Sequence, residues 1–265
     1  MHKLVALVTA YHRTSGGELE LCLQSLADQT RPADEIVVVF DGPVSPEVRA
    51  VAEHHQVRLV ELEMNLGSGL ASQAGMDSID AEYVARLDSD DAAKPDRFAI
   101  QLDFLERHPH IGAVGTAVEE FSQNPGDGGK IRCLPGNPEK YARINSPINN
   151  PSVMLRTRAV RESGGYRNIH FMEDYDLYAR MIAHGWSLQN LPQALTFFRV
   201  NPAQFERRTG REMFAAERKM QANLVEYGLI GPWRAKANLA LRTAYRLLPP
   251  ALLTRAYSKL FHRRG

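Results

Sequence analysis

The chain has 265 residues, of which 44% are apolar and 24% are charged, as is ordinary for a soluble globular protein. This length fits one large domain or two small ones. The formal net charge of +1 argues against a nucleic-acid-binding protein with a strong overall basic field, so no nucleic-acid partner is expected.

The near-zero net charge combines two unlike parts of the chain. Residues 231–265 carry eight Lys and Arg residues and no Asp or Glu. The first 230 residues hold the other 24 of the 32 basic residues and all 31 acidic residues, which gives them a formal charge of −7. A basic surface is therefore expected at the C-terminal end.

The cysteines and the N-terminus indicate a reducing compartment. Two cysteines in a chain of this length do not form a disulfide framework, and Cys22 lies in a helical pattern that predicts a small core residue. Residues 4–9 are a strand-length apolar run without the features of a signal peptide. No run approaches the roughly 18 apolar residues of a spanning helix, so we expect a cytoplasmic protein that does not cross the membrane.

The first 120 residues alternate apolar runs with helical patterns. Strands are expected at 3–9, 35–40, 57–63, 83–87 and 111–121, and helices at 18–29, 46–55, 68–78 and 95–107. Ser45 is the expected N-cap of the second helix, with Pro46 at its first position. This alternation predicts an α/β fold with a mostly parallel central sheet flanked by helices on both faces.

The second half is less regular. Residues 123–137 form a loop rich in Gly, Pro and Asn, which is followed by a strand at 152–155 and a Gly164-Gly165 break. A helix at 175–184, a strand at 195–200 and a polar amphipathic helix at 211–228 complete the expected elements.

An acidic segment, 88–91, follows the apolar strand at 83–87. In an extended chain Asp88 and Asp90 point the same way, and ligand sites of parallel α/β sheets lie at the carboxyl ends of strands. Two carboxylates there suit a divalent cation, Mg²⁺ or Mn²⁺, held together with substrate phosphates. The alternative is an acidic turn in which Asp91 or Asp96 caps the next helix.

Glu173 and Asp174 form a second acidic cluster, directly before the expected helix at 175–184. Acidic residues at a helix N-terminus are favoured by capping and by the helix dipole. The functional alternative is a general base beside a nucleotide site.

Six segments, in order, have motif character: 8–12 (Val-Thr-Ala-Tyr-His), 23–30 (Leu-Gln-Ser-Leu-Ala-Asp-Gln-Thr), 37–43 (Val-Val-Val-Phe-Asp-Gly-Pro), 65–71 (Asn-Leu-Gly-Ser-Gly-Leu-Ala), 86–91 (Arg-Leu-Asp-Ser-Asp-Asp) and 172–177 (Met-Glu-Asp-Tyr-Asp-Leu). Together they resemble nucleotide-sugar glycosyltransferases of family 2, which have the GT-A fold. Residues 150–154 and 198–200 also fit. Within this family, the segments most resemble those of bacterial enzymes of exopolysaccharide, O-antigen and amylovoran-type assembly. The chain departs from the family pattern at Ser72-Gln73, where relatives commonly have Arg-Asn.

The resemblance implies roles for individual residues. The implied nucleotide-binding residues are Ala10, Tyr11, Asp41, Gly67, Arg86, Asp88, Ser89 and Arg199. Asp90 would hold the divalent cation, with Asp88 sharing it or contacting the ribose. In inverting members the aspartate of the Glu-Asp motif is the base, which implies Asp174, and Glu173 would orient the acceptor.

The implied function is transfer of a hexose from a UDP-sugar, or a dTDP-sugar, to a polyprenyl-diphosphate-linked saccharide. One alternative is a sugar nucleotidyltransferase, for which the segment 11–17 would be the glycine-rich loop and Glu173-Asp174 would be unexplained. Another is a non-catalytic nucleotide-sugar-binding membrane scaffold, which would keep its full function after Asp174→Asn.

The C-terminal part is expected to be a separate extension. We expect the GT-A domain at 1–205, with a nucleotide-binding half at 1–121 and an acceptor-side half at 138–205, and a basic helical extension at 206–265. Apolar residues at 252, 253, 256, 257, 260 and 261 form a helical stripe with basic residues beside it. This pattern predicts association with an anionic membrane surface, at the cytoplasmic face of the inner membrane. The alternative is a helix that packs on the domain with its basic residues solvated.

Overall fold

The computed structural model describes residues 3–200 and 211–246. Within these residues the strands form one nine-stranded sheet in the order β3-β2-β1-β4-β8-β6-β9-β5, with β7 paired to β6. The strands are β1 (Leu4–Tyr11), β2 (Glu35–Asp41), β3 (Arg58–Glu61), β4 (Tyr83–Asp88), β5 (Ala92–Ala93), β6 (Ile111–Phe121), β7 (Ile131–Arg132), β8 (Met154–Arg156) and β9 (Ser187–Arg199).

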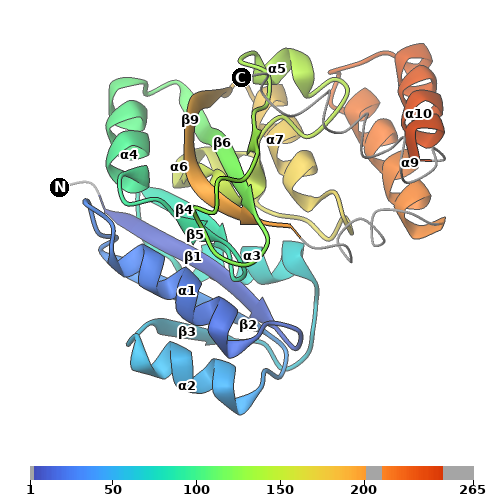
Figure 1. The fold of residues 1–265 in the computed structure, drawn as a ribbon. Helices are drawn as coiled ribbons and strands as arrows, with labels where there is room; N and C mark the ends of the chain where they lie inside the picture. The colour runs from blue at the N-terminus through green and yellow to red at the C-terminus, as the bar shows by residue number, and fades with distance from the viewer. Residues whose placement is uncertain (1–2, 201–210, 247–265) are drawn as a thin grey trace.

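Helices lie on both sides of the sheet (Figure 1), and all of them come between strands in the chain except the last two, which follow the last strand. They are α1 (Gly16–Ala27), α2 (Pro46–His54), α3 (Ser68–Ser78), α4 (Arg97–Arg107), α5 (Pro138–Tyr141), α6 (Thr157–Glu162), α7 (Glu173–Ala183), α9 (Arg211–Glu226) and α10 (Pro232–Arg246), with a 3₁₀ turn at Asn150–Ser152. Ser45 caps α2 as expected, because its side chain accepts a hydrogen bond from the Val48 amide at 3.3 Å.

The N-terminal half is the parallel part of the sheet. β1 lies between β2 and β4 and is parallel to both, and β3 continues the parallel order beside β2. β8 is antiparallel to its neighbours β4 and β6, whereas β9 runs parallel to β6. The predicted α/β fold with a mostly parallel sheet is confirmed.

Each face of the sheet has its own hydrophobic core, because side chains alternate along a strand. Leu4, Ala6 and Val8 pack on one face with α1, α2 and α4. Val5 and Leu7 pack on the other face with α3, α6 and α7. Cys22 is fully buried in the first core, as predicted.

The C-terminal helices form a third core with α7. Met213, Met220 and Leu224 of α9 pack with Tyr175 and Ala179 of α7, while α10 packs along α9 (Figure 1). Among the described helices none combines the length and apolar character needed to cross a bilayer. The predicted stripe at 252–261 lies outside the described residues.

Candidate active site

The ends of three parallel strands bring the predicted nucleotide-binding segments together. Tyr11 at the end of β1 is in register with Asp41 at the end of β2, and Thr9 is in register with Asp88 at the end of β4. Because these strands are parallel, their carboxyl ends lie at the same edge of the sheet (Figure 1).

Arg86 and Asp88 form an ion pair on the face of β4 that carries α3 and α7. Nη1 of Arg86 lies 2.6 Å from Oδ1 of Asp88. The arginine side chain is only 4% exposed, whereas that of Asp88 is 31% exposed. The charge of Asp88 raises the pKa of Arg86 against the opposing effect of burial, so the guanidinium stays protonated. This places a fixed positive charge beneath a carboxylate that solvent can reach.

Asp90 and Asp91 follow Asp88 in the turn after β4. Burial and the charge of Asp88 raise the pKa of Asp90 to about 6. Burial likewise raises the pKa of Asp91, which is fully enclosed, and its Oδ1 accepts a hydrogen bond from the Arg199 amide at 2.7 Å. Like charges held this close favour a bound cation, because a cation offsets their repulsion.

The alternative, in which Asp91 or Asp96 caps the helix that follows, holds for the position of Asp96 but not for a capping hydrogen bond. Asp96 occupies the N-cap position of α4, but its side chain makes no capping hydrogen bond. Asp91 bonds to β9 instead, through the Arg199 amide. The turn therefore joins the end of β4 to β9 and does not serve the helix that follows.

Ser89 and Arg199 hold this acidic turn in place. Oγ of Ser89 lies 3.2 Å from Oγ1 of Thr14, which in turn accepts the Tyr11 amide at 3.1 Å. Nε of Arg199 donates to the Asp90 carbonyl oxygen at 2.9 Å, and its guanidinium lies 4.6 Å from the Phe121 ring centre. Ser89 thus connects the turn to the loop after β1, and Arg199 connects it to β9 and β6.

The carboxylates fit a metal that takes its other ligands from substrate. No cluster of three or more His, Cys, Asp or Glu residues suited to a metal occurs in the described part of the chain. Asp88 and Asp90 supply two oxygen donors, and Mg²⁺ or Mn²⁺ commonly completes its shell with substrate phosphates and water. The residues therefore fit a phosphate-bridged cation and do not form a closed protein cage.

Asp41 organises the glycine loop that precedes α3. Its Oδ1 accepts the Leu66 amide at 2.6 Å, and its Oδ2 accepts the Gly67 amide at 3.0 Å. Gly67, with a φ of +90°, is the N-cap residue of α3, and no side chain caps that helix. A carboxylate has about four lone-pair sites, so Asp41 keeps acceptor capacity for a further donor.

Ala10 and Tyr11 differ in what they can offer a ligand. The Ala10 side chain is fully buried in the core beneath α1, so only its backbone is near the edge of the sheet. The partly exposed Tyr11 ring lies 5.2 Å, edge to face, from the His12 ring. Of these two residues, only Tyr11 presents a side chain to a flat ligand.

Asp174 lies in the first turn of α7, which begins at Glu173 rather than at 175. Burial and the charge of Glu173 raise the pKa of Asp174 to about 7. Oδ1 accepts the Tyr175 amide at 2.7 Å, and Oδ2 accepts the Ser146 hydroxyl at 3.4 Å. A carboxyl group with this pKa can both take and release a proton near neutral pH.

Arg86 connects the two acidic clusters electrostatically. Its charge lowers the pKa of Asp174, against the larger effects of burial and Glu173, while it pairs directly with Asp88. The Tyr166 hydroxyl lies in the same field, because the charges of Arg86, Asp174 and Asp88 all act on it. The predicted metal-binding aspartate Asp88 and the predicted base Asp174 are thus both under the influence of the buried Arg86 guanidinium.

Glu173 packs against the beginning of α3. A Cβ atom added to Gly69 would lie 3.0 Å from Cβ of Glu173 and 2.6 Å from the Arg167 carbonyl oxygen. Only glycine fits this approach without displacement. The beginning of α3 and Glu173, one member of the predicted catalytic pair, therefore pack closely together.

Sequence reasoning missed Arg97, which is fully buried behind the acidic turn. Its Nη2 donates to the carbonyl oxygens of Arg86 at 2.6 Å and Val153 at 3.1 Å. Burial lowers its pKa to about 9. Its position on the apolar stripe of α4, beside Phe98, is the signal that could have found it.

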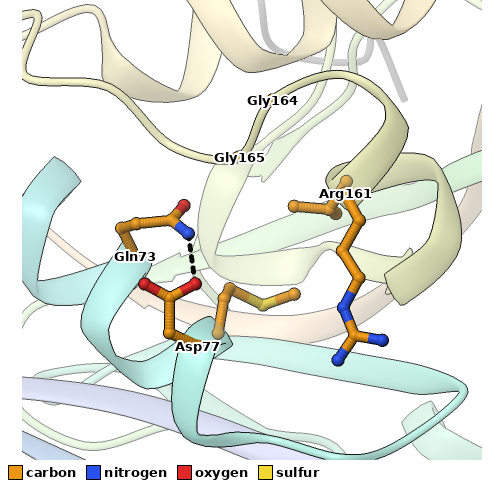
Figure 2. Close-up of a pocket in the computed structure, with 7 residues that line it drawn as sticks. Gln73, Asp77, Arg161, Gly164 and Gly165 are labelled. Carbon is orange, nitrogen blue, oxygen red and sulfur yellow. Dashed lines mark hydrogen bonds between the residues drawn. The ribbon is translucent and has the colours of Figure 1, made fainter.

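Gln73 occupies the position where the chain departs from the family pattern. Its Oε1 accepts the Tyr166 amide at 2.6 Å. Its Nε2 donates to Oδ1 of Asp77 at 2.7 Å, as Figure 2 shows. It therefore joins α3 to the loop before α7. Beside it lies a cavity of about 280 Å³, which Arg161, Gly164 and Gly165 also line and which contains none of the predicted site residues.

Comparisons with known proteins identify the family of the chain. The sequence profile described as glycosyl transferase family 2 matches residues 6–163. The amylovoran biosynthesis glycosyltransferase AmsE of Erwinia amylovora is 34% identical over 258 residues, which are 96% of this chain and 97% of that protein. A UDP-Gal:alpha-D-GlcNAc-diphosphoundecaprenol beta-1,3-galactosyltransferase of Escherichia coli is 31% identical over 267 residues, with 98% and 97% covered.

A solved structure shares the fold. The crystal structure of S. aureus TarS 1-349 in complex with UDP matches with a TM-score of 0.66 and 17% sequence identity, over 97% of this chain and 72% of that chain. At this identity the likeness shows the fold alone, and it confirms the predicted GT-A type of architecture.

Proposed function

Because the chain belongs to glycosyl transferase family 2, we propose that it transfers a hexose from a UDP-sugar, or a dTDP-sugar, to a polyprenyl-diphosphate-linked saccharide. The reaction would serve the synthesis of a bacterial surface polysaccharide and would invert the anomeric carbon. The relative from Escherichia coli supports this choice, because its name describes transfer of galactose from UDP-Gal to a diphosphoundecaprenol-linked GlcNAc.

The observation that carries the proposal is the arrangement of Asp88 and Asp174 around Arg86. Arg86 lies 2.6 Å from Asp88, and its charge also reaches the carboxyl group of Asp174. A nucleotide-sugar donor needs positive charge at its diphosphate and a base near the anomeric carbon. The buried arginine beside Asp88 would supply the positive charge, and Asp174, whose pKa is about 7 and which the charge of Arg86 also affects, would supply the base.

In this proposal the donor nucleotide lies along the edge formed by β1, β2 and β4. Tyr11 stacks on the base, Asp41 accepts a base N–H, and the backbone of Ala10 and Gly67 lines the nucleotide. Ser89 and Arg199 support the acidic turn through the hydrogen bonds described above. The hydrogen bonds from Asp41 to the Leu66 and Gly67 amides would hold the glycine loop beside the nucleotide.

Asp88 and Asp90 would hold a divalent cation, Mg²⁺ or Mn²⁺, against the diphosphate. When bound, the cation stabilises the negative charge that develops on the leaving nucleoside diphosphate. Arg86 holds Asp88 in position and adds a fixed positive charge to the same region. Asp90, with a pKa of about 6 in the protein alone, becomes fully ionised when a cation binds.

Asp174 takes the proton of the acceptor hydroxyl as that oxygen attacks the anomeric carbon. Its raised pKa makes it a stronger base than an ordinary aspartate, and the Tyr175 amide orients its carboxylate. Glu173, beside the start of α3, orients the acceptor. Inversion follows because the acceptor attacks from the face opposite the diphosphate.

The domain proposal assigns transfer to residues 1–205 and membrane association to residues 206–265. A lipid-linked acceptor is confined to a membrane surface, and the C-terminal part carries the excess of basic residues. The protein would act at the cytoplasmic face of the inner membrane as a peripheral protein. Its acceptor-side half, 138–205, contains Asp174.

The test is a donor panel with the full chain. Release of nucleoside diphosphate is measured with UDP- and dTDP-sugars, with Mg²⁺ or Mn²⁺, and with or without a diphospholipid acceptor analogue. Asp174→Asn should abolish acceptor-dependent release and keep donor binding, whereas Asp103→Asn, at an exposed carboxylate of α4, should be unchanged. No release with any donor would overturn the proposal.

A further inference from the structure

α10 packs onto the molecule through polar side chains. Nδ2 of Asn238 donates to the Arg143 carbonyl oxygen at 2.8 Å, and Nη1 of Arg242 donates to the Ile144 carbonyl oxygen at 2.9 Å. Asn238 is only 6% exposed. The inward face of this helix is thus held largely by hydrogen bonds to the segment after α5.

The outward face of α10 is apolar. Trp233 is 82% exposed and Leu241 is 64% exposed. Together with three exposed alanines they form a stripe with helical spacing: Trp233, Ala237, Ala240, Leu241 and Ala244. A surface helix ordinarily turns its apolar stripe toward the core, whereas α10 turns Ala235 and polar side chains inward and leaves this stripe exposed. A helix that presents its apolar side to solvent indicates a binding surface.

Basic residues flank this stripe on both sides. At 3.6 residues per turn, Arg234 and Lys236 fall on opposite sides of Trp233, and both are exposed. Nζ of Lys236 lies 4.7 Å from the Trp233 ring centre. Residues 247–265, which follow α10 and lie outside the described residues, add four more basic residues and no acidic ones. This face of α10 therefore fits a binding partner with an apolar interior and an anionic outer layer.

We infer that this outward face of α10 binds an anionic membrane, with Trp233 and Leu241 in the interface and Arg234 and Lys236 against the headgroups. Tryptophan favours the boundary between water and lipid, and basic residues beside an apolar helix face favour anionic lipid. The inference deepens the proposed function and rests on its lipid-linked acceptor. It assigns the membrane contact to a described helix and not to the terminal residues alone.

The contacts beneath α10 give the membrane a fixed relation to the active site. Asn238 also donates to Oε1 of Gln221 on α9 at 3.0 Å. The Tyr227 hydroxyl, directly after α9, donates to Oδ1 of Asp176 on α7 at 2.7 Å. Hydrogen bonds from α10 to α9, and from the residue after α9 to α7, thus connect α10 to the helix that begins with Glu173 and Asp174.

The test uses Trp233 as its own probe. In a Trp186→Phe background Trp233 is the remaining one of the two tryptophans, so its emission reports the outward face of α10. The full chain is mixed with vesicles of phosphatidylglycerol and phosphatidylcholine, or of phosphatidylcholine alone. We expect a blue shift and quenching by brominated lipid only with the anionic vesicles.

Variants then separate this face from the rest of the chain. Trp233→Ser with Leu241→Ser should lower co-sedimentation with anionic vesicles at least tenfold. Ile131→Ser, at an exposed apolar residue of β7, should leave it unchanged. Arg234→Glu with Lys236→Glu should weaken binding and reduce its dependence on salt. Circular dichroism checks that each variant is folded, as the exposure of these side chains predicts.

Two results would overturn the inference. One is unchanged vesicle binding by the Trp233→Ser, Leu241→Ser variant, which would assign the contact to other residues. The other is a Trp233 emission shift that follows protein concentration without vesicles, which would indicate a second copy of the chain on this face. Vesicle binding is measured without donor, and nucleotide release with a water-soluble acceptor analogue, so failure of the inference and failure of the proposed function remain distinguishable.

Discussion

Asp176 and Arg180 form an ion pair that is enclosed within α7, with Nε of the arginine 2.8 Å from Oδ2 of the aspartate. Their side chains are 0% and 2% exposed. Oδ1 of Asp176 accepts hydrogen bonds from Asn223 at 3.0 Å and from the Tyr227 hydroxyl at 2.7 Å. Nη2 of Arg180 donates to the Gly165 carbonyl oxygen at 2.6 Å. The pair therefore joins α7, the predicted catalytic helix, to α9 and to the loop that precedes α7.

Arg180→Met should strongly destabilise the protein, because it leaves the Asp176 charge buried without its partner. Loss of one member of a buried pair costs about 3–5 kcal/mol. Arg158→Met is the matched control, since Arg158 forms a 2.7 Å pair with Glu162 in which the side chains are 76% and 44% exposed. Such an exposed pair contributes less than about 1 kcal/mol. Urea unfolding measures both changes, and equal losses would contradict this account.

The acceptor-dependent rate should rise with pH through about 7, the pKa of Asp174, because the base must be ionised to accept a proton. Asp174→Asn should remove both the activity and this part of the pH profile. The measurement is the rate at saturating donor and acceptor from pH 5.5 to 8.5. A flat profile in the unsubstituted protein would contradict the assignment.

The carboxyl group of Asp174 should also make the stability of the protein depend on pH, with stability falling over the pH range in which the rate rises. The folded-state pKa of about 7 lies above the unfolded value near 3.8, so the folded state binds more protons between these values. Stability should therefore fall as pH rises from about 4 to about 7. At pH 8, Asp174→Asn should stabilise the protein by on the order of 1–3 kcal/mol, an effect that should shrink toward pH 4. Urea unfolding at both pH values checks the sign.

Much of the fold could be predicted because local pattern and tertiary structure agree in the N-terminal half. The expected helix at 68–78 and strand at 111–121 match α3 and β6. β9 was the main miss, since it begins at Ser187 rather than at 195. Its first half contains Gln189, Asn190 and Pro192, which do not look like a strand, and its pairing with β6 includes register shifts. That part is a strand because β6 is beside it.

The site could be predicted only where acidic residues lie at one end of a recognisable element. Asp88 and Asp90 follow an apolar strand, and Asp174 precedes a helix, so their placement is visible in the sequence. The buried partners of Arg97 and Asp176 could not be found, because they come from segments far apart in the chain. The roles predicted for the site residues stay predictions that the experiments above address.

Removal of the acidic turn's charge should abolish metal-dependent donor binding. Asp90→Asn and Asp88→Asn each take away one of two proposed oxygen ligands, whereas Asp103→Asn changes an exposed carboxylate on α4. The measurement is the rise in melting temperature that UDP causes with and without Mn²⁺. We expect Mn²⁺ to increase that rise in the unsubstituted chain and in Asp103→Asn, but not in the two variants of the turn. An unchanged Mn²⁺ effect in Asp90→Asn would exclude it as a ligand.

Gly69→Ala should reduce turnover because its new methyl group would lie 2.6 Å from the Arg167 carbonyl oxygen and 3.0 Å from Cβ of Glu173. Relief of that overlap displaces the segment that begins α7 and costs about 1–3 kcal/mol of stability. Gly17→Ala is the matched control, since Gly17 also lies in a helix and has no atom within 4 Å of the added Cβ. It should keep full turnover and gain up to about 0.5–1 kcal/mol, because alanine favours the helix over glycine. If Gly69→Ala keeps full turnover, contact between α3 and Glu173 does not position the catalytic pair.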